Sequence, residues 1–328
     1  MTAETSETSR LTSADARQAT GILVTVMATV AFAANNVLIP LAYGHGVTPT
    51  ALLLLRYIIL VAGLLIILPL AGQSLWLPRR YYVPAIATGC FSCLDSLGLI
   101  TAFGLIPVGL SLLIFYLYPI LTAILQGLIE RRPVSLVQFG CLVSAFAGLA
   151  IALGAGGEGF AHGLNLIGLL SALGAAVASA AMLLCLRYGL ADAEPGAMTL
   201  STSLASMALA AIAGAALSAA GLAPFHIPGL GNSIGWLTIV ALSVFFSFGY
   251  FGISRGAQLL GATPTAMLMN LETVFSIPLA AIILGEALDT PRLTGAAIVL
   301  ASVVVSQWLA ARRTLQTHPP QDVRPRIS

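Results

Sequence analysis

The stretch GATPTAMLMNLETVFSIPLAAIILG, residues 261–285, is long and apolar, yet it carries an amide, Asn270, and a carboxylate, Glu272, near its middle. At about 1.5 Å per helical residue, it is long enough to cross a hydrocarbon core of about 30 Å. A charged side chain at the bilayer centre costs about 2.5–3.5 kcal/mol on insertion scales, so Glu272 is expected to face other helices or a wet cavity. The stretch therefore predicts a membrane-spanning helix with a polar site at mid-depth.

The rest of the chain has the composition of an integral membrane protein. Of its 328 residues, 58% are hydrophobic and 8% are charged, whereas soluble domains are about 25% charged. Short connections rich in Gly, Pro or Arg separate further apolar runs of similar length. We predict an all-α membrane protein with ten transmembrane helices, which cover residues 19–42, 49–71, 82–105, 107–129, 135–155, 164–187, 197–221, 233–254, 261–285 and 291–311.

The arginines predict the orientation of these helices, because the chain has no lysine and fourteen arginines. In the ten-helix prediction, twelve arginines lie on one side of the bilayer, while Arg292 lies on the other side and Arg56 lies inside a helix. Since positively charged loops stay in the cytoplasm, both termini are predicted to be cytoplasmic. The tails, residues 1–17 and 312–328, are polar enough to be disordered. The abundant Ala, Gly and Arg favour a GC-rich bacterial genome, and so a multi-pass protein of the bacterial inner membrane.

Two polar stripes recur in the second half of the chain, at offsets of 155 and 154 residues. The paired positions are Thr88 with Ser243, Ser92 with Ser247, Asp95 with Tyr250, Ser111 with Thr265, Tyr118 with Glu272, and Thr122 with Ser276. A unit of five helices forces the next unit to enter from the opposite side of the membrane. Such inverted repeats are common in secondary transporters, whose site lies at the repeat interface near the midplane. We therefore predict two inverted five-helix repeats, residues 18–155 and 156–311.

Four segments together carry a family resemblance. They are AFAANNVLI (31–39), LLLLRYIIL (52–60), ISRGAQLLGATPTAMLMNLETVFSIPLAAIILGEAL (253–288) and PRLTG (291–295). In these segments the chain resembles the EamA branch of the drug/metabolite transporter superfamily. The resemblance implies ten helices and the export of small metabolites, often amino acids, without ATP.

Three formally charged side chains lie inside the predicted spans: Glu272, Arg56 and Asp95. Glu272 is interpreted either as a site for a substrate amine or a proton, or as a structural residue that ties its helix to a neighbour. Arg56 and Asp95 lie at similar depths, about 10–15 Å from the outer side. They predict an ion pair that seals or supports the outer half of the cavity, and the functional alternative is capture of a substrate carboxylate by Arg56.

Uncharged side chains complete the candidate site. Amides bind a polar substrate or clamp helices together, and tyrosines line a cavity or pack in the core. These candidates are Asn35, Asn36, Asn270, Ser92, Ser247, Tyr116, Tyr118 and Tyr250. Pro119 and Pro278 predict kinks at equivalent places in the two halves, because proline removes a backbone donor.

These features favour a secondary transporter that exports small metabolites, amino acids above all, by alternating access. The alternatives within this class are a proton-coupled multidrug antiporter and a nucleotide-sugar exchanger. A channel or a membrane-embedded enzyme is less favoured, because the sequence has no segment like a selectivity filter and no HExxH, GxSxG or P-loop motif. We expect a small-molecule substrate in a lipid bilayer, with no cofactor, metal or nucleic acid. Cys90 and Cys93 form a CxxC that we interpret as packing residues.

Overall fold

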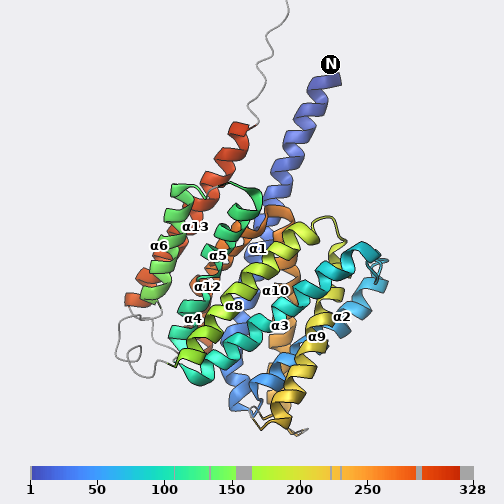
Figure 1. The fold of residues 1–328 in the computed structure, drawn as a ribbon, viewed down its shortest axis with the longest axis vertical. Helices are drawn as coiled ribbons and strands as arrows, with labels where there is room; N and C mark the ends of the chain where they lie inside the picture. The colour runs from blue at the N-terminus through green and yellow to red at the C-terminus, as the bar shows by residue number, and fades with distance from the viewer. Residues whose placement is uncertain are drawn as a thin grey trace, which may run out of the picture.

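The computed structural model describes residues 2–106, 108–132, 134–152, 165–221, 224–229, 231–285 and 290–317, and within these segments it is helical, with no strand. The helices run alongside one another in one bundle, and the ends of α1 and α13 project from the same end of it (Figure 1). The elements are α1 (Thr2–Gly44), α2 (Pro49–Leu70), the 3-10 turn η1 (Arg79–Tyr81), α3 (Tyr82–Leu105), α4 (Val108–Phe115), α5 (Tyr118–Glu130), α6 (Leu136–Ala152), α8 (Leu166–Leu184), the π turn η2 (Cys185–Gly189), α9 (Pro195–Ala219), α10 (Ser233–Leu260), α11 (Ala262–Met269), α12 (Leu271–Leu284) and α13 (Thr290–Thr317).

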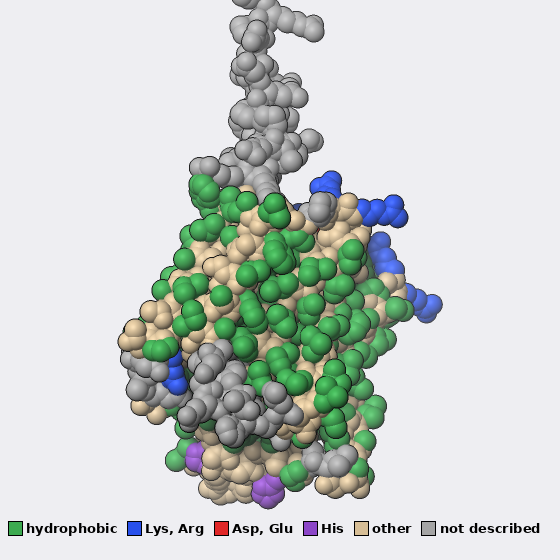
Figure 2. All heavy atoms as spheres, turned by 60° about the vertical axis from the view of Figure 1, so that its left-hand side comes forward, with side chains coloured by type: hydrophobic (Ala, Val, Ile, Leu, Met, Phe, Trp, Pro, Cys, Tyr) green, Lys and Arg blue, Asp and Glu red, His purple; other side chains and the backbone are tan. Residues whose placement is uncertain are grey.

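Eight segments of the described chain are long and apolar enough to cross a membrane. They are Ala16–Gly44, Pro49–Leu70, Arg79–Ala102, Leu110–Glu130, Leu166–Gly189, Pro195–Ala219, Ser233–Leu260 and Ala262–Leu284. Two shorter apolar helices, Leu136–Ala152 and Thr290–Ser306, coincide with the remaining two predicted spans. Figure 2 shows hydrophobic side chains across the middle of the visible face, with most of the visible arginines toward one end and histidines at the other. The protein is thus an all-helical, multi-pass membrane protein.

The ends of the chain differ from the predicted disordered tails. α1 begins at Thr2, so the expectation that the first 17 residues are disordered is wrong over the described part. α13 continues to Thr317, past the predicted end of the last span at residue 311. The rest of the predicted C-terminal tail, residues 318–328, and the predicted boundary between the repeats at 155 and 156 lie outside the described residues.

Two of the predicted spans are each interrupted near their middle. The first is interrupted at Tyr116 and Leu117. α5 begins at the next residue, Tyr118, and its first turn contains Pro119. This placement is expected, because proline disfavours a helical residue before it but is tolerated in the first turn. In the second half, the interruption lies at Asn270, whereas Pro278 lies inside α12. The kink predicted at Pro278 stays a prediction, and the two interruptions are separated by the same 154 residues as the second pair of polar stripes.

Small residues set the closest helix contacts. α3 packs against α8 and α9, and α1 packs against α10 and α12. A Cβ atom added at Gly89 of α3 would collide with the Thr202 carbonyl oxygen of α9, and one added at Gly256 of α10 would collide with the Thr25 hydroxyl of α1. The backbones therefore approach within a distance that only glycine permits, as in other membrane bundles.

This contact predicts a stability difference between two glycine variants. Gly89→Ala is expected to destabilise the protein by about 1–3 kcal/mol, because the new methyl group must displace backbone. Gly174→Ala on α8 is the matched control, since nothing lies within 4 Å of its added Cβ. The unfolding temperature in detergent should fall for the first variant and stay or rise for the second. Equal values for the two variants would show that α3 and α9 do not pack as described.

Candidate functional site

Glu272 lies in the first turn of a helix that begins inside the membrane span. Because the chain is interrupted at Asn270, α12 starts at Leu271, and its first turn carries this carboxylate. The first backbone N–H groups of a helix have no partner within it, and the N-terminal end of the helix dipole attracts negative charge. Discontinuous helices of this kind build the binding sites of many secondary transporters. The interruption therefore stabilises an acidic group at a depth where it would otherwise be costly.

Side chains from two other elements contact this carboxylate. Asn36 of α1 donates a hydrogen bond to Glu272 Oε1 through its Nδ2 atom, and the Tyr116 hydroxyl donates to the same oxygen over 3.5 Å. The Asn35 amide lies 2.7 Å from Asn36 Oδ1. The structure thus brings together four of the predicted site residues, from α1, α12 and the interruption before α5.

The pattern of exposed residues along α1 indicates an accessible space beside Asn36 and Glu272, which we call the hollow. Four of the five exposed large hydrophobic residues in the described part of α1 share one face of the helix, and they are Leu23, Met27, Val30 and Leu41. At about 100° per residue, Asn36 points away from this face, toward the helices that pack on α1. Asn36 is nevertheless exposed, and Glu272 is partly exposed. Both side chains therefore reach an accessible space between helices.

From the exposure of residues along α1, we infer that this hollow opens toward one end of the bundle. Tyr43 lies on nearly the same face of α1 as Asn36, closer to the C-terminal end of the helix, and it is exposed. Thr25 and Thr29, on the inward side of α1 closer to its N-terminus, are fully buried. The accessible space therefore leads toward the end of the bundle opposite the N-terminus.

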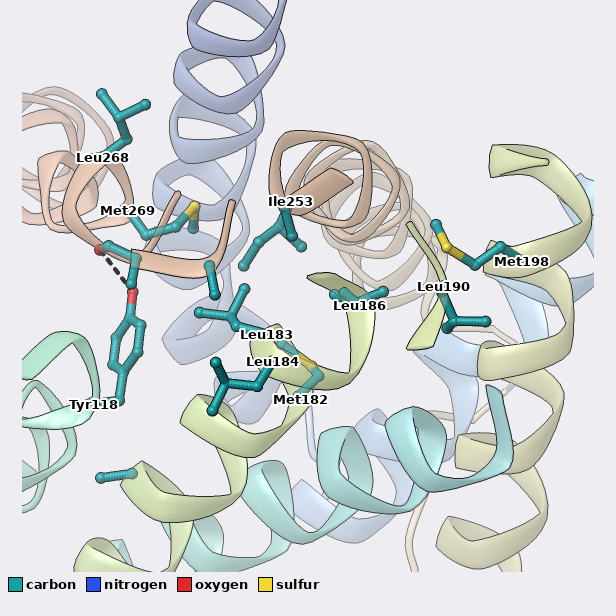
Figure 3. Close-up of a cluster of buried hydrophobic side chains, with 14 of the residues drawn as sticks. Tyr118, Met182, Leu183, Leu184, Leu186, Leu190, Met198, Ile253, Leu268 and Met269 are labelled. Carbon is teal, nitrogen blue, oxygen red and sulfur yellow. Dashed lines mark hydrogen bonds between the residues drawn. The ribbon is translucent and has the colours of Figure 1, made fainter. Parts of the chain in front are cut away.

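A cluster of buried apolar side chains lies next to this site (Figure 3), and we infer that it forms the closed end of the hollow. Leucine and methionine side chains from α8, η2 and α9 pack there against residues of α10 and α11. Tyr118, a predicted cavity residue, belongs to this cluster, and its hydroxyl donates to the Ala266 carbonyl oxygen over 3.4 Å. Tyr116, which contacts Glu272, belongs to the same cluster, so the cluster reaches from Tyr118 to the site.

Hydrogen bonds reinforce the closed end. The Gln126 side-chain oxygen on α5 accepts bonds from the backbone N–H and the hydroxyl of Thr263, at 3.1 and 2.8 Å, which joins α5 to α11. Gln258, only 1% exposed, donates to the carbonyl oxygens of Leu190 and Ala193 at 2.6 and 3.1 Å. Sequence reasoning missed these glutamines, although an amide within an apolar span carries the same signal as a buried asparagine.

Arg56 and Asp95 do not form the predicted ion pair. No nitrogen of Arg56 lies within 4.0 Å of an Asp95 oxygen, and each side chain has a buried polar atom without a partner, Nε and Oδ1 respectively. Instead, the guanidinium lies over the ring of Phe246, 4.5 Å from its centroid. A cation over an aromatic face is stabilised without a carboxylate, which explains why the pairing fails although the two residues are near one another.

An aromatic group surrounds this guanidinium. The rings of Tyr57 and Tyr250 pack against Phe246, with centroids 5.5 and 5.8 Å from it. The Tyr57 hydroxyl forms a 2.8 Å hydrogen bond with Ser92, a predicted site residue that is buried here. Tyr57 and Phe246 were not among the predicted site residues. The position of Tyr57 directly after Arg56 is the only sequence signal that pointed to it.

The other predicted polar residues play smaller parts. Ser247 donates to the Ser243 carbonyl oxygen of its own helix over 2.7 Å, as serines in membrane helices commonly do. Asn270 is 2% exposed, and its Oδ1 atom has no partner. Thr265 and Ser276 bond to backbone carbonyls of their own helices, and neither bonds to Glu272. Within the described residues, no group of three or more His, Cys, Asp or Glu side chains is placed to hold a metal.

Comparison with known proteins agrees with a membrane transporter. The sequence profile of the EamA-like transporter family matches residues 166–308. No curated protein matches the chain. Among solved structures, one titled "Crystal structure of protein" is 21% identical, with a TM-score of 0.70, and the alignment covers 92% of this chain and 99% of the other. At this identity, the likeness shows a shared fold over nearly the whole chain. The second half of the chain is therefore similar to a family of membrane transporters, in agreement with the apolar helical spans.

Proposed function

We propose that the protein is a secondary transporter that exports small metabolites, amino acids above all, by alternating access. The observation that carries this proposal is the partly exposed carboxylate of Glu272 at mid-depth, to which Asn36 and Tyr116 donate hydrogen bonds. An accessible carboxylate at mid-depth, held by neutral donors, provides a place where a substrate amine or a proton binds. The same carboxylate would be a costly choice for a purely structural link between helices.

Helix packing supports two inverted five-helix repeats within the ten predicted spans. In such an arrangement, α1, α2 and α3 of the first repeat correspond to α8, α9 and α10 of the second. The contact of α1 with α10 then corresponds to that of α3 with α8, and the contact of α2 with α10 corresponds to that of α3 with α9. The contacts of α2 with α9 and of α6 with α13 correspond to themselves. In inverted-repeat transporters, this pseudo-symmetry allows the two repeats to exchange conformations around one site.

The orientation gives the direction in which the hollow opens. With both termini in the cytoplasm, as the arginines favour, the hollow faces outward and the apolar cluster of Figure 3 forms the cytoplasmic barrier. Export then requires a second state in which the helix ends carrying this cluster separate and the walls beside Asn36 and Tyr43 close. The bacterial inner membrane is the location that this orientation and composition favour.

A counterflow experiment tests the proposal. Purified protein is reconstituted into liposomes loaded with one unlabelled amino acid, and uptake of the labelled form is followed for each of the twenty amino acids. A carrier gives a transient accumulation of label above equilibrium for at least one of them, whereas a channel gives only passive equilibration. Exchange of cationic drugs or nucleotide sugars without exchange of any amino acid would overturn the proposed substrate class.

A further inference from the structure

Buried polar atoms without partners concentrate in one part of the bundle. Among the described residues, such side-chain atoms belong to Arg56, Asp95, Ser203, Trp236, Tyr250 and Asn270. All except the last are on α2, α3, α9 or α10, which pack against one another. A buried polar group without a partner is costly, and native structures almost always supply one, from protein, water or ligand. The concentration of such atoms on four adjacent helices therefore points to a missing binding partner.

Three of these residues are close enough to act on one ligand. The Arg56 guanidinium lies over Phe246, whose ring packs against that of Tyr250 with centroids 5.8 Å apart. Ser92, about one helical turn before Asp95 on α3, bonds to Tyr57, whose ring also packs against Phe246. Arg56 and Asp95 are partly exposed, although their unpartnered atoms are buried, so a ligand that reaches these residues must displace side chains to bond to those atoms. The ring of Phe246 lies against the guanidinium and fixes its position. The two opposite charges are thus held near each other but apart, with unused hydrogen-bonding capacity on each.

We propose that Arg56, Asp95 and Tyr250 form a subsite for the head group of a zwitterionic α-amino acid. The guanidinium binds the α-carboxylate, Asp95 binds the α-ammonium group, and the Tyr250 hydroxyl bonds to the carboxylate. A planar guanidinium suits a carboxylate because it donates two parallel hydrogen bonds. This inference rests on the proposed transport function and specifies the substrate class.

The charges of the subsite favour a zwitterion over singly charged ligands. A cation alone would leave the guanidinium of Arg56 without a partner, and an anion alone would leave Asp95 without one. The head group of an amino acid supplies both partners on adjacent atoms. Glu272, on α12, is then not needed for the head group and remains for a proton or for the substrate side chain.

Ligand binding to the purified protein tests the subsite directly. The unfolding temperature in detergent is measured with each of the twenty amino acids, and then with the methyl ester and the N-acetyl derivative of every amino acid that raises it. The ester lacks the carboxylate charge and the N-acetyl compound lacks the ammonium group. We expect at least one free amino acid to stabilise the protein, and its two derivatives to bind at least about tenfold more weakly. Stabilisation by none of the twenty, or equal binding of both derivatives, would overturn the subsite.

Two variants test which residue binds the α-carboxylate and which binds the α-ammonium group. In Arg56→Gln, the free amino acid should lose at least about tenfold in affinity while its methyl ester changes little. In Asp95→Asn, the free amino acid should instead lose affinity while its N-acetyl derivative changes little, so that the preference for the free amino acid over this derivative disappears. Arg79→Gln, which changes an exposed arginine in η1, is the matched control and should behave as wild type. Because discrimination between ligands is a ratio within one variant, a change in stability alone does not produce it. An unchanged ratio in both variants would refute the assignment.

The outcomes separate this inference from the transport proposal. If amino acids exchange in counterflow but their methyl esters and N-acetyl derivatives compete equally well, the subsite is refuted while transport stands. If free amino acids bind with the expected preferences but nothing exchanges across the liposome membrane, the subsite stands and the transport proposal is refuted.

Discussion

Glu272→Gln is expected to reduce amino-acid counterflow to the level of liposomes without protein. The substitution keeps the size of the side chain and a carbonyl oxygen for the bonds from Asn36 and Tyr116, but it removes the negative charge and the exchangeable proton. If the carboxylate binds a substrate amine or a coupled proton, its charge is needed in every cycle. Flux in proteoliposomes is the measurement, with the unfolding temperature as a check that the variant folds normally.

The control for this variant is Glu194→Gln. Glu194 is an exposed carboxylate at the start of α9, outside the candidate membrane spans, and the same chemical change there should leave counterflow intact. If Glu272→Gln gives wild-type flux and an unchanged response to a pH gradient, Glu272 has only a structural role. In that case the hollow would need another group at its centre.

Glu272 could be predicted from the sequence as a site residue, because any charged side chain inside a membrane carries a large free-energy cost. Glu272 had to have partners, and Asn36 and Tyr116 were among the few polar candidates at a similar depth. The ten apolar runs and the offset between the two halves followed from length and spacing alone. These features depend on periodicity and hydrophobicity, which a single sequence records well.

The arrangement of Arg56 and Asp95 was not accessible in the same way. Their similar depth predicted a pair, but depth does not fix the direction in which a side chain points. The guanidinium instead lies over Phe246, a residue nearly 200 positions away in sequence. Likewise, Pro278 is a stronger local helix breaker than Asn270, yet the helix is interrupted at Asn270. Both outcomes depend on packing between helices of the two halves, which local sequence does not specify.

The closed end of the hollow makes a second prediction with a large effect. A covalent link between α5 and α11 is expected to abolish transport. In the proposed alternating-access cycle, the ends of these helices at the closed side must separate, and the contact between Gln126 and Thr263 joins them in the present state. Both residues are replaced by cysteine, with the four native cysteines changed to serine, and the pair is joined by a short, reducible methanethiosulfonate cross-linker. Counterflow should fall to background and return after reduction.

Treatment of the two single-cysteine variants with the same reagent controls for modification without linkage, and both should keep most of their flux. A measurement of amino-acid binding should distinguish the cross-linked protein from a misfolded one, because the cross-link holds the closed end of the hollow and leaves its open end unchanged. Cross-linked protein in detergent is therefore expected to bind amino acids as tightly as the reduced protein. Full counterflow in completely cross-linked protein would mean that α5 and α11 stay together throughout the cycle. The cytoplasmic barrier would then have to open elsewhere, and the apolar cluster around Tyr118 would be permanent core.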